Sequence, residues 1–75
     1  MTKLPILSGD KVVKAFSKAG WVKNRQKGSH IIMTKIESDI ILSIPVHKNK
    51  TVKRGTLNAL IKDAGLSIDE FIELL

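Results

Sequence analysis

Cysteine is absent from this sequence of 75 residues, which excludes disulfide bonds, thiolate metal sites and a cysteine nucleophile. No apolar run approaches the roughly 20 residues that a membrane-spanning helix needs. The first residues lack the long apolar stretch of a secretory signal, and no repeat, low-complexity tract or linker divides the chain. We therefore expect one domain, residues 1–75, that acts in the cytoplasm and does not enter a membrane.

Other catalytic arrangements are missing too. The serines do not have the spacing of a nucleophile elbow, and Gly28 stands alone, so no glycine-rich loop is available to cradle a phosphate. The two histidines and the scattered carboxylates do not form the ligand set of a structural zinc site. The sequence thus predicts neither a metal nor another cofactor, and it leaves His30 and His47 as the candidates for chemistry.

Positive charge is what the sequence has in excess, since its net charge at pH 7 is +6. Residues 1–54 carry twelve basic and three acidic side chains, whereas residues 55–75 carry one basic and four acidic ones. A basic body of this kind is typical of proteins that bind phosphate backbones or an acidic partner. The composition alone leaves open the alternative that the charge only keeps a small domain soluble.

Helical patterns flank a central region of strands. Ser8 can cap a helix over residues 9–19. A second helical repeat of apolar residues runs from Leu57 to Ala64 and is closed by a glycine. Residues 67–70 read as a capping box, which predicts a short terminal helix.

Three short strands are expected between these helices, over residues 21–26, 29–35 and 40–46. A two-residue turn at Glu37 and Ser38 places the apolar residues of the second and third strands on one face of an antiparallel sheet. On the other face, His30 and His47 become diagonal neighbours. The predicted fold class is α+β, in the order helix, three-stranded antiparallel sheet, helix and short helix.

The hairpin between the first two strands has two interpretations. A Lys27-Gly28 turn places Lys23 and Arg25 on the face of His30, but it places Trp21 there as well. A bulge or a longer turn reverses that assignment, and the sequence leaves both open. The basic residues of this strand could also do no more than protect a sheet edge from aggregation.

His30 is the residue best suited to chemistry, because an imidazole can take or give a proton near neutral pH. RNA cleavage needs little more than proton transfer, since the 2′-hydroxyl is an internal nucleophile beside its phosphorus. A base removes the hydroxyl proton, and an acid protonates the departing 5′-oxygen. Cations stabilise the negative charge that develops on the phosphate as the bonds change. The simpler alternative is a surface or hydrogen-bonded histidine, and the same holds for His47 after Pro45.

Several segments, taken in chain order, resemble the HicA family of toxins. Gly28-Ser29-His30 looks like the G-S-H strand signature of that family, and Ile44-Pro45-Val46-His47 resembles the segment that follows it. The other matching segments are residues 4–5, 8–9, 55–57, 61–67 and 70–71. The departures are Asp69, where the family often has glutamate, and residues 34–39, which do not match.

The resemblance implies a fold like that of a double-stranded-RNA-binding domain and the activity of an mRNA-cleaving endoribonuclease. It implies His30 as the catalytic residue and a HicB-type antitoxin as the partner that blocks this histidine. The RNA-binding candidates are Arg25, Lys27, Gly28, Ser29, His47, Lys53 and Arg54. Two rivals remain at this point. One is a non-catalytic RNA-binding module of similar fold, and the other is an interaction protein whose basic face docks an acidic partner.

Overall fold

The first helix begins at a serine and ends before a glycine, because these residues satisfy its two ends. In the computed structural model, α1 spans Gly9–Lys18. The Ser8 hydroxyl accepts a hydrogen bond from the Lys11 amide (3.4 Å). Gly20 takes a φ of 97° where the chain leaves the helix, a conformation that suits glycine. Both predicted ends of this helix are therefore confirmed to within one residue.

The central hairpin has the register that its alternating pattern predicts. β2 (His30–Thr34) and β3 (Ile41–Pro45) pair in antiparallel fashion, with His30 opposite Pro45 at one end. The side chains that face the helices are all buried: Ile31, Met33, Leu42 and Ile44. Burial of one face pins the register, because a shift by one residue would expose this whole apolar set.

The turn between β2 and β3 lies one residue earlier than the sequence predicts. The Ser38 amide donates to the Lys35 carbonyl (3.1 Å), so Ile36 and Glu37 are the central residues. Glu37 has a φ of 64°, and the Ser38 hydroxyl accepts a hydrogen bond from the Ile40 amide (3.2 Å). The favoured two-residue hairpin turns need residues with a positive φ, and in this segment only Glu37 has one. A longer connection therefore forms without changing the register.

The turn between β1 (Val22–Lys27) and β2 consists of Gly28 and Ser29, since Lys27 lies opposite His30. The predicted Lys27-Gly28 turn is therefore wrong. The reason is the position of Gly28, the glycine of this hairpin, which has a φ of 60° and serves as the first of the two turn residues.

A β-bulge interrupts β1 between Lys23 and Arg25. Arg25 and Lys27 pair with outer-face residues of β2, whereas Trp21 on the other side of the bulge is only 3% exposed and joins the core. Lys23 does not join the outer-face group. Of the two interpretations of this hairpin, the bulge is the one that the structure contains. It lets β1 present cations outward while Trp21, the residue before this strand, packs inward.

The two C-terminal helices are α2 (Arg54–Asp63) and α3 (Ile68–Ile72). The predicted capping box starts α3: the Ser67 hydroxyl accepts from the Glu70 amide (3.1 Å), and the Ser67 amide donates to the Glu70 carboxylate (2.9 Å). Phe71 is fully buried, and its ring centroid lies 5.1 Å from that of Phe16 on α1. This aromatic contact anchors α3 to the core.

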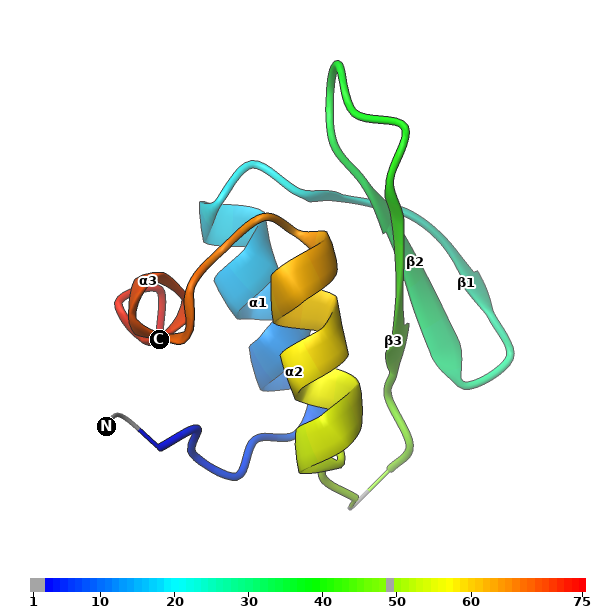
Figure 1. Cartoon of the computed structure of the whole chain (residues 1–75). Coiled ribbons are helices and arrows are strands. Elements are labelled where there is room, and N and C mark those ends of the chain that lie inside the picture. Colours follow the sequence, from blue (N-terminus) through cyan, green and yellow to red (C-terminus); the bar gives the residue numbers. More distant parts are fainter. Residues whose placement is uncertain (1–2, 49) are drawn as a thin grey trace.

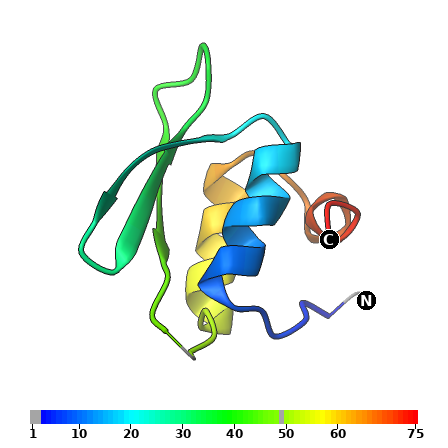
Figure 2. The ribbon, with the colours of Figure 1, turned by 180° about the vertical axis from the view of Figure 1, so that it is seen from behind.

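The elements stack in layers (Figure 1, Figure 2). α1 and α2 lie against one face of the sheet, whose strand order is β1-β2-β3, and α3 lies on the far side of these helices. The structure describes residues 3–48 and 50–75, and no helix in this part of the chain is long and apolar enough to cross a membrane. The fold is α+β as predicted, and it leaves the outer face of the sheet without a helix.

Candidate functional site

The two histidines lie side by side at one end of the sheet. His30 is the first residue of β2, and His47 follows β3 by two residues, which makes them the diagonal neighbours that the register predicts. Their ring centroids are 6.1 Å apart, and the rings meet edge to face at 79°. Both side chains are exposed, so a ligand can reach them from solvent.

Backbone hydrogen bonds hold the loop that carries His47. The Val46 amide donates to the Ser29 carbonyl (2.7 Å), which extends the β2–β3 ladder past the end of β3. The Lys50 amide donates to the His47 carbonyl (3.1 Å). Farther along, Thr51 forms a bridge with Ser8, just before α1. The position of His47 therefore depends on both the β1–β2 turn and the start of α1.

Gly9 packs the start of α1 directly against the end of β3. A Cβ atom at this position would collide with the Pro45 carbonyl oxygen and lie 2.8 Å from the Val46 Cα. Only glycine allows this close approach. The contact therefore determines where the Pro45–Val46 backbone, which leads into His47, lies relative to α1. The sequence pattern places Gly9 in the first turn of the helix, but it contains no signal for this contact.

A surface pocket of about 500 Å³ opens beside the two rings. Its lining combines the two imidazoles, two ammonium groups and three hydroxyls with one proline: His30, Ser43, Pro45, His47, Lys50, Thr51, Lys53 and Thr56. None of these residues carries a carboxylate. Cations and hydrogen-bond donors without a competing negative charge make a suitable site for an anion such as a phosphate.

The N-terminus of α2 faces the same region and differs from those of α1 and α3. Lys53 is its N-cap residue but makes no side-chain cap hydrogen bond, and the first turn contains no acidic residue. The backbone N–H groups of this turn therefore remain available to an incoming acceptor, and the helix dipole adds partial positive charge. With Lys50 and Lys53 alongside, this end of α2 favours a bound phosphate.

Only part of the predicted RNA-binding set lines the pocket. Of that set, His47 and Lys53 do so, and Lys50, Thr51, Ser43 and Thr56 are additions. These additions come from three separate segments, and although Thr56 belongs to the segment 55–57 that resembles the family, no sequence pattern brings these segments together. Their proximity is a product of the fold.

The remaining predicted residues do not line the pocket. Lys27 lies opposite His30, and Arg25 lies farther along β1 on the same outer face. Gly28 and Ser29 form the adjoining turn, and Arg54 is the first residue of α2. All five are exposed. Within residues 3–48 and 50–75, none of these cations has an ion-pair partner.

The described part of the chain contains no cluster of three or more histidine, cysteine, aspartate or glutamate side chains that could hold a metal ion. The site is therefore composed of imidazoles, cations and hydroxyls. Groups of these kinds can transfer protons and stabilise negative charge on a phosphate.

Comparison with known families identifies the chain. A family profile described as "HicA toxin of bacterial toxin-antitoxin" matches residues 9–66, a span that includes the whole sheet, both histidines and α2. Comparison with curated proteins yields no match. The family match covers more than half of the 75 residues and starts at Gly9, whose contact with the end of β3 helps to build the site. The protein therefore belongs to the HicA family of bacterial toxin–antitoxin toxins.

Proposed function

We propose that this protein is an endoribonuclease toxin that cleaves mRNA, with His30 as its catalytic residue. The observation that carries the proposal is the pocket of about 500 Å³ in which His30 and His47 lie beside Lys50 and Lys53 with no carboxylate in the lining. A ribonuclease that uses the 2′-hydroxyl of its substrate needs this combination, namely an imidazole for the proton and cations for the phosphate.

The proposed reaction is a transesterification within the RNA. The 2′-oxygen forms a bond to the adjacent phosphorus as its proton leaves, and the bond from phosphorus to the 5′-oxygen of the next nucleotide breaks as that oxygen gains a proton. His30 acts as the general base or the general acid in this exchange. The products are a 2′,3′-cyclic phosphate and a free 5′-hydroxyl, and the reaction consumes no cofactor.

The cations divide into two groups by position. Lys50 and Lys53 line the pocket, so we assign them to the phosphate at the cleavage site together with the amides at the start of α2. Arg25 and Lys27 lie along the outer face of β1, where they bind the flanking phosphates of the same strand. We propose that Arg54, Gly28 and Ser29 contact the edge of the same bound RNA strand.

His47 is assigned to substrate positioning. Its ring meets that of His30 edge to face at 6.1 Å, and both rings line the same pocket. The backbone contacts of its loop hold the main chain of His47 beside the pocket, which suits a residue that orients the substrate.

The partner that we propose is an acidic HicB-type antitoxin that covers the outer sheet face bearing His30. Opposite charge speeds association, which favours capture of the toxin before it meets RNA. We further propose that residues 1–75 form a single toxin domain acting in the cytoplasm, where mRNA is translated. A structure of the pair in which His30 remains open to solvent would contradict this mode of inhibition.

The direct test of the reaction compares two substrates of one sequence, a single-stranded RNA and its 2′-O-methyl counterpart. The protein, residues 1–75, should bind both substrates, cut only the RNA, and leave 2′,3′-cyclic ends, because methylation removes the nucleophilic hydroxyl. Cleavage of both substrates would contradict the mechanism. Binding of both with cleavage of neither would favour the non-catalytic RNA-binding module.

A further inference from the structure

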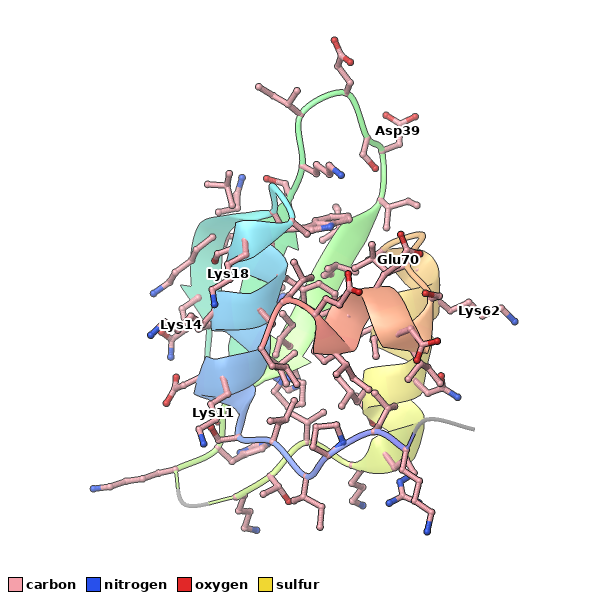
Figure 3. The ribbon with its side chains drawn as sticks, turned by 90° about the vertical axis from the view of Figure 1, so that its left-hand side faces the viewer. Lys11, Lys14, Lys18, Asp39, Lys62 and Glu70 are labelled. Atoms are coloured by element: carbon pink, nitrogen blue, oxygen red, sulfur yellow. The ribbon has the colours of Figure 1, made fainter. Side chains whose placement is uncertain are left out.

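A second basic surface lies away from the proposed RNA site, on α1. Lys11, Lys14 and Lys18 are spaced by three and four residues, which places them on one side of the helix. Figure 3 shows them one above another along α1, beside α3. They border a groove of about 340 Å³, which we name the lysine groove.

The rest of the lysine groove is apolar. Leu7 and Ala15 are buried residues of its lining, whereas Leu74 is partly buried and Leu75 is 47% exposed. The C-terminal residues thus face α1 across a strip of aliphatic surface. The groove contains no aromatic ring, hydroxyl or imidazole, in contrast to the pocket at His30.

The three ammonium groups of the lysine groove form no ion pair among the described residues, although Asp10 precedes Lys14 by four residues on the same helix. Like charges at these spacings repel one another, so an external anion would relieve the repulsion. An RNA strand would satisfy the charge but would gain nothing from the leucines, because nucleic-acid sites combine cations with stacking or hydrogen-bonding groups. An acidic segment with aliphatic side chains satisfies both parts of the groove.

We infer that the lysine groove binds an acidic, leucine-containing segment of a protein partner. Carboxylates of the segment meet the three ammonium groups, and its apolar side chains cover Leu74 and Leu75. This inference rests on the existence of a protein partner, which membership of a toxin–antitoxin family implies, and it is independent of ribonuclease activity.

The position of the groove gives this contact a specific consequence. α3 and the groove lie on the helical side of the molecule, whereas the outer sheet face lies on the other side (Figure 1). A segment bound here leaves the pocket at His30 open. A partner that also covers the sheet face would hold the protein at two places, and its second contact would form at high effective concentration.

The test is an NMR titration of the full chain with a short synthetic peptide that alternates glutamates with leucines at helical spacing. The comparison peptide replaces each leucine by serine and keeps the charge. We expect the largest shifts at Ala15 and Leu74, and at least tenfold weaker binding of the serine peptide. Lys14→Glu and Leu75→Ser should each weaken binding of the leucine peptide severalfold. Lys62→Glu on α2 is the matched control for charge reversal and should leave binding unchanged.

Three outcomes would overturn the inference: equal binding of both peptides, shifts confined to the pocket at His30, or no binding at all. A single-stranded RNA that shifts Ala15 and Leu74 instead would assign the groove to nucleic acid and overturn it as well. RNA cleavage by Lys14→Glu and Leu75→Ser should equal that of the parent. If the parent cuts no RNA while the peptide binds as expected, the proposed function fails and this inference stands.

Discussion

Replacement of Gly9 by alanine should disturb the site from a distance. The added Cβ would lie 2.8 Å from the Val46 Cα, so α1 and the end of β3 must separate by about 0.6 Å to bring this contact to 3.4 Å, and by more to clear the Pro45 carbonyl oxygen, which is closer still. Crowding of this kind costs about 1–3 kcal/mol, and the better helix propensity of alanine offsets about 0.5–1 kcal/mol. The difference between these ranges is about 0–2.5 kcal/mol, and the collision with the backbone oxygen of Pro45 favours its upper part. We therefore expect a net loss of about 1–2.5 kcal/mol in the free energy of unfolding.

The expected loss of stability and the expected loss of cleavage rate can be measured separately. In a domain of this size, each kcal/mol shifts Tm by about 4–8 °C, so the Tm of Gly9→Ala should be roughly 4–20 °C lower. Because a shift of about 1 Å can cost up to about 100-fold in rate, displacement of the chain before His47 should slow RNA cleavage by about tenfold or more. Cleavage is assayed at a temperature at which circular dichroism shows both proteins folded.

Gly55→Ala is the matched control for stability. The Cβ of an alanine at this position in α2 would meet nothing within 4 Å, so its Tm should rise by the amount that corresponds to about 0.5–1 kcal/mol. If Gly9→Ala instead raised the Tm and left the rate of RNA cleavage unchanged, the contact with the end of β3 would have no part in building the site and the reasoning would be refuted.

Further predictions concern the independence of cleavage from metal ions, the basic residues that bind RNA, and α3. Because the described residues contain no cluster of metal ligands, cleavage should persist in EDTA, and its loss with recovery on adding a divalent ion would contradict the mechanism. Reversing Lys50 and Lys53 to glutamate should weaken RNA binding more than reversing Arg25 and Lys27, and each lost phosphate contact should reduce the salt slope by about 0.7. Equal effects would place the cleavage site elsewhere. Phe71→Ala should cost about 3–5 kcal/mol in urea unfolding, since the ring is fully buried, and a loss below 1 kcal/mol would show that α3 is not anchored.

The register of the β2–β3 hairpin was predictable because the two strands alternate strictly. Ile31 and Met33 have to be buried opposite Leu42 and Ile44, and only one register does that. The adjacency of His30 and His47 follows from it. The capping box of α3 was predictable for a different reason, since its two hydrogen bonds join residues only three positions apart.

β1 shows where the sequence ceases to be informative. All six of its residues are exposed, so no alternation marks its register. The bulge between Lys23 and Arg25 is decided by the burial of Trp21, a tertiary contact that the local pattern does not contain. The same limit applies to Gly9 and Lys50. Both acquire their importance from contacts between distant segments, the first with the end of β3 and the second with the pocket beside the histidines.

The central claim is that His30 performs the proton transfer. The most direct measurement is the rate of RNA cleavage by His30→Ala and His47→Ala across about pH 5 to 9, with circular dichroism to confirm folding. Both side chains are exposed, so neither change should unfold the protein. We predict that His30→Ala loses about 10²–10⁴-fold in rate and that His47→Ala loses less. Equal loss in both folded variants would instead indicate an acid–base pair, and a His30→Ala protein that cuts RNA as fast as its parent would contradict the account.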